Sequence, residues 1–247
     1  LAAEWPGTLG AIFVVPLWHP VALAEHVATL AALSQGRFVL QAALGWRENE
    51  FAAMGVGLHD RVRRFEAGLA VVRRLLNGEA VSEPSIFEID GAEIGPAVQN
   101  VDVWVAGHAP QALQRAAHMA DGWIGGPAIP VEEAARLAEA YRRACGESGA
   151  RPGTVALRRD IHVAADATEA ADVMTDVIRE GYRGFDPSVL IVGDREAVAS
   201  ELRSLGDAGF DEVVVRQLAG SERDALRSIE RLHDVRTALN AAHPSAE

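Results

Sequence analysis

The chain has 247 residues, 49% of them hydrophobic, which is enough for a sizeable core. Its 23 basic and 35 acidic residues give a net charge of −12 without a basic run, which argues against nucleic acid or an anionic membrane as a partner. The one cysteine excludes an internal disulfide, no stretch is long and apolar enough to span a membrane, and the first residues lack a signal-peptide pattern, so we expect a cytoplasmic protein.

Strand-like and helix-like segments alternate along the chain. Apolar runs rich in β-branched residues predict strands over residues 8–15, 37–44, 101–107, 122–126, 155–165, 188–193 and 211–217, of which 188–193 is the weakest. Apolar residues at helical spacing predict helices over residues 21–33, 61–76, 110–120, 131–145, a segment after Asp166, 195–209, and 221 to about 239. The helix over 61–76 places Leu69, Val72 and Leu76 on one face.

Residues that favour helix ends stand at most of these boundaries. Pro20 and Pro130 suit a first helical turn, and Asp60, Asp166 and Asp194 can accept backbone N–H groups there. Further signals are Glu169 after Asp166, Asp224 after Ser221, and the stops at Gly36 and Asn77-Gly78.

Residues 79–100 interrupt the alternation with Pro, Gly and short β-like pieces, and they predict an insertion because the alternation resumes after them. Alternating strands and helices predict parallel βαβ units. Six strong units and one weak unit fit a doubly wound sheet, whereas a closed (β/α)8 barrel needs eight strands and usually about 250 residues. Composition and periodicity do not choose between the two.

The stretch from Val101 to Trp123 runs from a strand through Gly107 into a helix with Pro110 in its first turn. A helix N-terminus offers free backbone N–H groups and the positive end of a dipole, so a phosphate would suit this position. A plain strand–helix connection explains the same residues, and without further information we favour that simpler interpretation.

Ordered motifs along the chain resemble the luciferase-like monooxygenase family. The matching positions include His19-Pro20, Gly45-Trp46, Glu50-Phe51, the Arg61, Arg64 and Glu66 helix, the Val103–Trp123 block ending in Asp-Gly-Trp, and the Val192–Val215 segment. Each motif is weak alone, but their order and spacing cover nearly the whole chain. The Gly45–Phe51 segment is similar to the branch of the family that uses the deazaflavin coenzyme F420.

This resemblance implies a (β/α)8 TIM barrel with an insertion before its fifth strand. The chain then forms a single barrel domain over residues 1–247, with the insertion at about 79–100. Residues 8–15 match the family's third strand, so the first two βα units are expected to be missing ahead of Leu1, and the chain does not begin with Met. The resemblance also implies a homodimer that acts on a small-molecule substrate.

The resemblance also implies where a cofactor would lie. F420 is the expected cofactor, and FMN is the alternative. The family's phosphate contacts match Gly107, His108, Ala109, Gln111 and Ala112. The positions that lie against the flavin-like ring match Leu44, Gly45 and Asn49, together with Ala11, Ile12 and Val15, where the family often has a non-prolyl cis peptide bond near Ala11.

Trp46, Gly126 and Arg216 are weaker candidates for substrate binding. Some F420-dependent sugar-phosphate dehydrogenases place a glutamate acid where this chain has Trp46, and a phosphate-binding lysine where it has Ile129, so that chemistry is not supported and we name no catalytic residue. His19 is either a base or, as we prefer, a residue that orders the start of a helix. Arg158, Arg159 and His162 give one strand unusual charge, and no Cys/His cluster indicates a metal site.

The sequence therefore predicts an F420- or FMN-dependent oxidoreductase or monooxygenase. Two alternatives remain: a non-catalytic flavin-binding protein of the same superfamily, and a different α/β barrel enzyme such as a carboxylate-based hydrolase. The hydrolase needs paired acids at strand ends, which the sequence does not offer.

Overall fold

The computed structural model describes residues 8–34, 37–95, 97–98, 101–218 and 221–242. The chain divides into two compact units. Unit 1 comprises Leu1–Trp123 and Tyr141–Gly153, and unit 2 comprises Ile124–Ala140 and Thr154–Glu247. The short strand β6 (Gly122–Gly125) and the helix α5 (Val131–Ser148) each contribute residues to both units. The prediction of a single domain stays a prediction.

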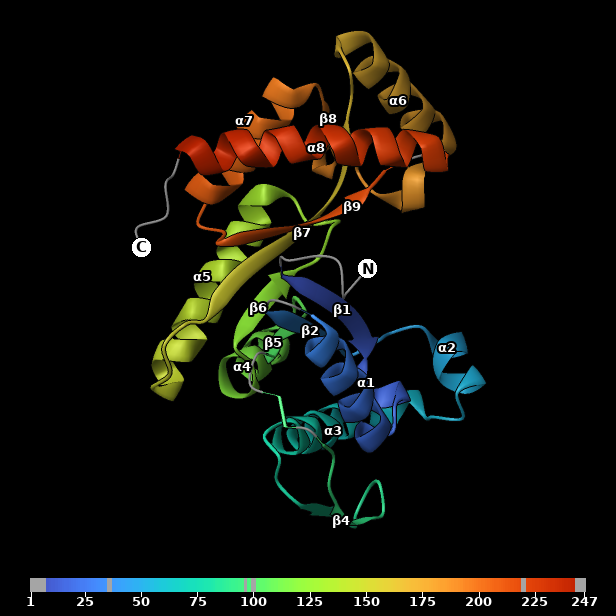
Figure 1. Cartoon of the computed structure of the whole chain (residues 1–247), viewed down its shortest axis with the longest axis vertical. Helices are drawn as coiled ribbons and strands as arrows, with labels where there is room; N and C mark the ends of the chain where they lie inside the picture. Colours follow the sequence, from blue (N-terminus) through green and yellow to red (C-terminus); the bar gives the residue numbers. More distant parts are fainter. Residues whose placement is uncertain (1–7, 35–36, 96, 99–100, 219–220, 243–247) are drawn as a thin grey trace. The chain divides into compact units, whose positions relative to one another are not determined.

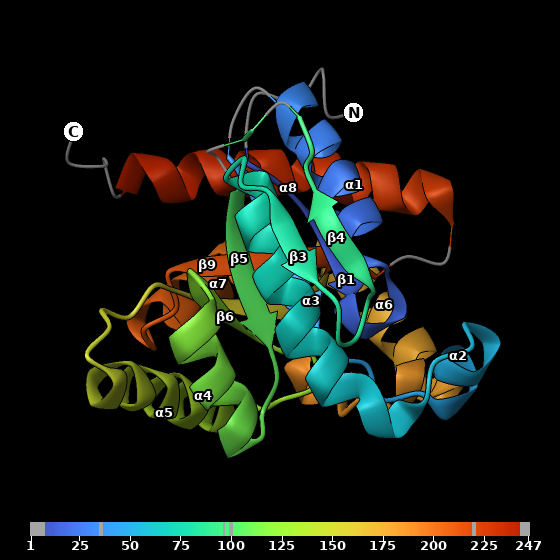
Figure 2. The same ribbon diagram turned by 90° about the horizontal axis from the view of Figure 1, so that it is seen from below.

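Unit 1 is built on three parallel strands, β1 (Leu9–Val14), β2 (Phe38–Ala43) and β5 (Val101–Ala106), seen in Figures 1 and 2. The strands pair in the order β1-β2-β5, with Ile12 opposite Gln41 and Gln41 opposite Trp104. Three longer helices accompany them: α1 (Pro20–Leu33), α3 (Arg61–Leu76) and α4 (Pro110–Met119). The parallel strand–helix alternation that the sequence predicts is confirmed.

The core of unit 1 lies between α1, α3 and the strands. Leu23 and Val27 of α1 are fully buried, as are Leu69 and Val72 of α3, and Leu76 is only 4% exposed. Burying side chains of this size contributes about 1.5–3 kcal/mol each, so the apolar stripes fix both helices in place. The predicted buried face of the helix over 61–76 is therefore confirmed.

The insertion forms a separate antiparallel hairpin of β3 (Val81–Glu83) and β4 (Ile89–Ala92), which lies beside α3 in Figure 2. Glu83 organises the turn because its carboxylate accepts the backbone N–H groups of Ile86 and Phe87. The hairpin thus stands apart from the parallel strands, as the sequence predicts.

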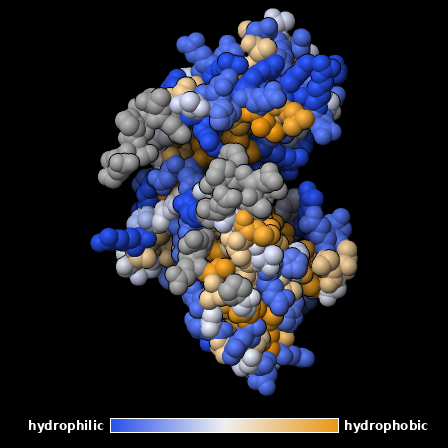
Figure 3. All heavy atoms as spheres, in the orientation of Figure 1, coloured by the Kyte–Doolittle hydropathy of each residue, from blue (hydrophilic) through white to orange (hydrophobic). Residues whose placement is uncertain are grey.

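Unit 2 is centred on the long strand β7 (Thr154–Val163), which pairs in parallel with β8 (Ile191–Gly193) and β9 (Glu212–Gln217). Its helices are α6 (Ala167–Glu180), α7 (Arg195–Asp207) and α8 (Glu222–Ala242). The face seen in Figure 3 is mostly hydrophilic around α7 and α8. Among the described helices, none is long and apolar enough to cross a membrane.

The predicted helix boundaries hold better than the predicted capping contacts. Asp194 and Asp166 cap α7 and α6 as expected, and Ser221 accepts the N–H of Asp224. Asp60 stands at the start of α3, but its side chain makes no capping hydrogen bond and instead lies 3.2 Å from His59. This prediction was wrong because Asp60 has helical φ and ψ of −82° and −7°, whereas an N-cap residue has extended backbone angles. Gly36 lies outside the described residues.

Short helices fill segments that the sequence leaves as loops. Residues between the second expected strand and α3 form α2 (Glu48–Ala53), whose six residues are too few to show helical periodicity. Single 3₁₀ turns occur at η1 (Val15–Leu17), η2 (Leu58–Asp60), η3 (Tyr182–Gly184) and η4 (Pro187–Val189).

Candidate functional site

Parallel pairing brings the carboxyl ends of β1, β2 and β5 to one edge of unit 1. Val14 stands opposite Ala43, and Ala42 opposite Val105, so the residues that follow the three strands are neighbours. In α/β sheets this edge is where ligands bind, because the strand–helix connections there are free to carry side chains and open N–H groups. The edge holds six of the eleven predicted cofactor-binding residues, namely Val15, Leu44, Gly45, Gly107, His108 and Ala109.

Gly45 allows the end of β2 to approach β1 closely. Its φ is +76°, and a Cβ there would lie 2.6 Å from Val14 Cγ1 and 2.8 Å from Phe51 Cε2. Only glycine combines this backbone conformation with this lack of space. The chain just after β2 therefore presents backbone without a side chain at Gly45. A planar ring could lie against such a surface.

Gly107 forms an equally tight connection between β5 and α4. Its φ is +154°, and a Cβ there would lie 2.5 Å from the Cβ of Ala112, in the first turn of α4. The helix therefore starts directly against the backbone of the strand end. A side chain at this position would collide with Ala112 and push α4 away.

Two residues of the Asp-Gly-Trp segment hold this connection in place. The buried Trp123 ring donates from Nε1 to the Gly107 carbonyl at 2.8 Å. Asp121 accepts the Val103 N–H at 2.9 Å and binds both terminal nitrogens of Arg73 at 2.8 and 3.0 Å, which ties β5 to α3. Because a trans peptide points its N–H opposite to its C=O, fixing the Gly107 carbonyl turns the N–H of His108 away from Trp123.

The N-terminus of α4 carries no capping side chain. Ala109 is the N-cap residue, its carbonyl accepts the N–H groups of Ala112 and Leu113, and Pro110 has no N–H to donate. The N–H of Gln111 therefore faces outward in the first turn with the positive end of the helix dipole behind it. The connection from Gly107 to Gln111, the α4 cradle, suits a phosphate because its backbone and the first turn of α4 supply donors without a side chain at residue 107.

Trp46 and Asn49 lie next to this edge, on and before α2. They line a shallow pocket of about 600 Å³ with Arg47, Glu48 and Ala52. Trp46 is 77% exposed, and the guanidinium of Arg47 lies 5.2 Å from the centre of its ring. The Oδ1 of Asn49 accepts the N–H of Glu50, so only its amide N–H₂ is open to a ligand carbonyl.

Ala11 and Ile12 lie in the middle of β1 and continue its parallel ladder, opposite Leu40 and Gln41. Successive strand residues point to opposite faces, so the two side chains cannot both face one ring. Ile12 is 54% exposed and shares a face with Gln41 and Trp104, which makes it the one of the pair that presents a side chain to solvent on that face.

Two predicted site residues, Gly126 and Arg216, belong to unit 2. Gly126 directly follows β6, and Arg216 is an exposed residue near the end of β9. The loop after β6 is anchored to β7, because the buried Arg159 donates to the carbonyl of Ile129 at 2.9 Å. Burial lowers the pKa of Arg159 to about 10, so it remains a cation at neutral pH.

The two histidines singled out by the sequence take up structural contacts. His19 is the N-cap residue of α1 by position, but its side chain makes no capping bond and its ring meets that of Phe87 edge to face. His162 is buried in β7, and its Nε2 lies 3.1 Å from Glu169. No group of three or more potential ligands for a metal ion occurs among the described residues.

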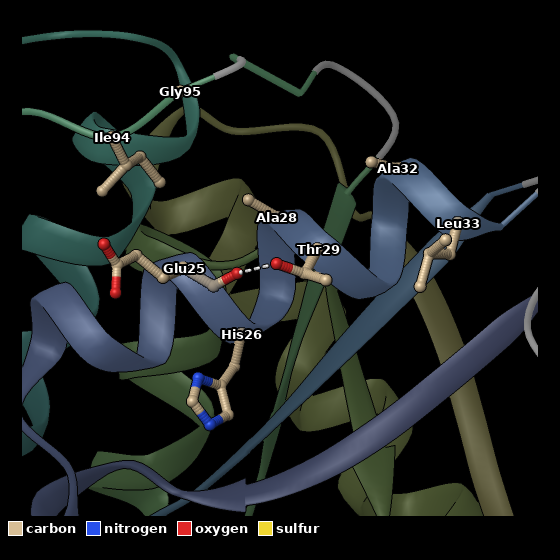
Figure 4. A pocket seen from close by; sticks show the side chains of 8 residues that line it. All are labelled: Glu25, His26, Ala28, Thr29, Ala32, Leu33, Ile94 and Gly95. Carbon is tan, nitrogen blue, oxygen red and sulfur yellow. Dashed lines mark hydrogen bonds between the residues drawn. The ribbon is translucent and has the colours of Figure 1, made fainter.

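A second pocket lies between α1 and the residues that follow β4. It has a volume of about 550 Å³, and Figure 4 shows its lining residues, which are Glu25, His26, Ala28, Thr29, Ala32, Leu33, Ile94 and Gly95. The Thr29 hydroxyl donates to the Glu25 carbonyl at 2.8 Å within the helix. This hydrogen bond is internal to α1, and we do not assign this pocket to the site.

Parallel strands that alternate with helices define an α/β protein, and its glycine-lined strand ends and uncapped helix N-terminus would suit a phosphate-bearing ligand. Residues 8–237 match the family model of the luciferase-like monooxygenases, and the chain belongs to this family. The resemblance seen in the sequence is confirmed.

Among curated relatives, the chain is 33% identical over 143 residues to a phthiodiolone/phenolphthiodiolone dimycocerosates ketoreductase of Mycobacterium tuberculosis. That match takes in 56% of this chain but only 37% of the ketoreductase, so the chain spans little more than a third of that relative's length.

Solved structures share the fold at lower identity. A monooxygenase from Streptomyces bottropensis gives a TM-score of 0.76 at 20% identity over 93% of this chain and 76% of that chain. An F420-dependent secondary alcohol dehydrogenase in complex with an F420–acetone adduct gives 0.71 at 17% identity over 90% and 76%. The oxygenating constituent of 3,6-diketocamphane monooxygenase from Pseudomonas putida, in complex with FMN, gives 0.71 at 17% identity over 91% and 77%.

Proposed function

We propose that this chain is the cofactor-binding part of an oxidoreductase that uses F420, or alternatively FMN, to act on a small organic substrate. Family membership supports the proposal. Three similar proteins support it further: an F420-dependent dehydrogenase, a monooxygenase in complex with FMN, and a ketoreductase. Both cofactors carry a phosphate and a flat ring system, so either one must meet the same two requirements in this chain.

The observation that carries the proposal is the tight connection from Gly107 into α4, whose first turn has no side-chain cap. The cofactor phosphate would lie there, with donors from the backbone of His108, Ala109 and Gln111. Ala112 contributes close packing rather than a contact, because its Cβ occupies the position that bars a side chain at residue 107. The fit requires no charged side chain, since the helix N-terminus supplies the positive potential.

The ring would lie along the neighbouring strand ends. Gly45 presents bare backbone beside Val14, Val15 is buried just after β1, and Leu44 would give an apolar contact. Asn49 has its amide N–H₂ available for a ring carbonyl. When bound, the cofactor supplies the hydride or flavin–oxygen chemistry, and the residues of this chain bind it, orient it and exclude water from one of its faces.

The substrate and the reaction type follow from the cofactor in this proposal. F420 implies hydride transfer between the cofactor and an alcohol or ketone, and FMN implies oxygenation. Trp46 cannot serve as a general acid, so it would contact the substrate as a flat, apolar wall. Gly126 and Arg216 stay predictions for substrate binding.

Three further predictions belong to the same proposal. We expect β1 to take the position of the third strand in the family's (β/α)8 barrel, a cytoplasmic location, and a homodimer. Light scattering after size exclusion measures the mass of the assembly directly. A mass twice that of the chain is the expected result, and a monomer at micromolar concentration would contradict the dimer.

The proposed phosphate site is tested by titrating FMN and F420 into the protein and into variants at residue 107. Gly107→Asp should weaken binding by about tenfold or more relative to Gly107→Asn, because both side chains crowd Ala112 but only the carboxylate repels a phosphate. Gly146→Asp, in open space on α5, is the control and should bind as the wild type does. Equal cofactor affinity of the Asp and Asn variants would contradict the placement of the cofactor phosphate at this position.

A further inference from the structure

The second half of β7 and the neighbouring β9 carry a group of arginines that the proposed cofactor site does not use. Asp160 is fully buried in β7, and its carboxylate lies 3.4 Å from Arg158 and 3.3 Å from Arg183. Arg216 stands opposite Asp160 in the strand register, so the two side chains share a face of the sheet. Two guanidinium groups thus lie at one carboxylate, with Arg216 on the same face of the neighbouring strand, and Asp160 balances only one of the three positive charges.

Asp160 is the acidic side chain that pairs with Arg158 and Arg183. Among the described residues, no ion pair is seen for Arg216. Glu169 of α6, which lies 3.1 Å from His162, already accepts from Arg231 at 3.0 Å. The two contacts to Asp160 are also longer than the roughly 2.7–2.9 Å of a tight charge-assisted hydrogen bond, so the arginines are not closed around it.

The surrounding residues hold the guanidinium groups in position. The Tyr182 hydroxyl donates to Asp160 at 2.9 Å, and burial together with this bond raises the pKa of Tyr182. Arg183 adopts φ +49°, a left-handed conformation that is rare for a residue with a side chain and that persists mainly at functional sites. Its guanidinium also lies 5.0 Å from the centre of the Phe185 ring.

We propose that Arg158, Arg183 and Arg216 form a binding site in unit 2 for a small oxyanion, the phosphate or carboxylate group of a small molecule. The planar fork of arginine matches both groups with paired N–H donors. Arg183 and Arg216 are exposed, so the site is open to solvent. Asp160 is buried beneath the site and holds Arg158 and Arg183 by its ion pairs. The residues of this site all belong to unit 2 and include none of the proposed phosphate site at α4, so the inference does not depend on the cofactor proposal.

The site is tested by calorimetric titration of inorganic phosphate, and in parallel of acetate, into the whole protein at low salt. Arg216→Gln should weaken binding by about tenfold or more, because it removes one charge-assisted contact from an exposed residue without disturbing the core. Arg179→Gln is the matched control: it removes an equal charge from α6, where Arg179 pairs with Asp176, and should leave the affinity within about twofold.

Running the titration in the Gly107→Asp background separates this site from the cradle at α4. Arg216-dependent binding that survives there supports the proposal, even if the cofactor no longer binds. Stronger binding of phosphate identifies a phosphoester as the ligand, and stronger binding of acetate identifies a carboxylate. The proposal is overturned if neither anion binds saturably in the millimolar range, or if Arg216→Gln and Arg179→Gln have equal affinity.

Discussion

Gly107 serves packing, and in the proposed function it also serves binding. Its missing side chain lets Ala112 approach and places no side chain beside the first turn of α4. The carbonyl of Gly107 is fixed by the indole of Trp123, sixteen residues further along the chain. Gly107 therefore allows the conformation of the connection, and Trp123 stabilises it through the hydrogen bond to the Gly107 carbonyl.

Replacing Trp123 with Phe tests that division of roles. The ring stays apolar and fills most of the buried space, but the Gly107 carbonyl loses its donor, which costs about 1–3 kcal/mol for a buried polar group. We expect the free energy of unfolding in urea to fall by that amount and cofactor affinity to fall with it. An unchanged affinity in a destabilised but folded variant would show that Trp123 supports the fold and not the cradle.

Among the elements, α6, β7 and α8 are joined through one carboxylate. Glu169 accepts the Ala165 N–H at 2.7 Å, accepts from Arg231 of α8 and contacts His162 of β7. Burial alone raises the pKa of Glu169, but the hydrogen bonds from Ala165, Arg231 and His162 outweigh that effect and hold it at about 2. The expected capping box is thus modified, since Glu169 reaches back to Ala165 and not to Asp166.

This lowered pKa predicts how stability depends on pH. In the unfolded chain the pKa of Glu169 has its ordinary value of about 4.5. Between about pH 4.5 and 2 the folded state therefore binds fewer protons than the unfolded state. The contribution of Glu169 is complete above that window and is lost as the pH falls through it. Glu169→Gln should be less stable at pH 7 and should lose less stability on acidification, measured by urea unfolding.

Asp176→Asn is the control for that measurement, because Asp176 lies on the same helix in an exposed pair with Arg179. Its stability should follow that of the wild type across the whole range. A Glu169→Gln curve parallel to the wild type would contradict the assignment.

Elements with a long apolar period were predictable because their pattern needs no tertiary information. The buried face of α3 and the strand ends at Gly45 and Gly107 are local properties of this kind. The contacts that complete the sites are not local. Asp121 meets Arg73 across 48 residues, and Tyr182 meets Asp160 across 22, and neither pair has a fixed spacing that a sequence pattern could reveal.

At the scale of the whole molecule, membership of the luciferase-like monooxygenase family and the geometry of unit 1 both support the proposed cofactor. The parallel strands and helices fit the family, and the α4 cradle is the proposed place for one end of the cofactor. The oxyanion site of unit 2 is an independent feature, because its residues belong to β7, β9 and η3 and share none with α4.

The most direct test of the central claim is a structure of the protein with F420 or FMN bound. We predict the cofactor phosphate within hydrogen-bonding distance of the backbone N–H groups of Ala109 and Gln111, directly in front of Gly107. A bound cofactor whose phosphate lies elsewhere, with the first turn of α4 left to solvent, would contradict the account.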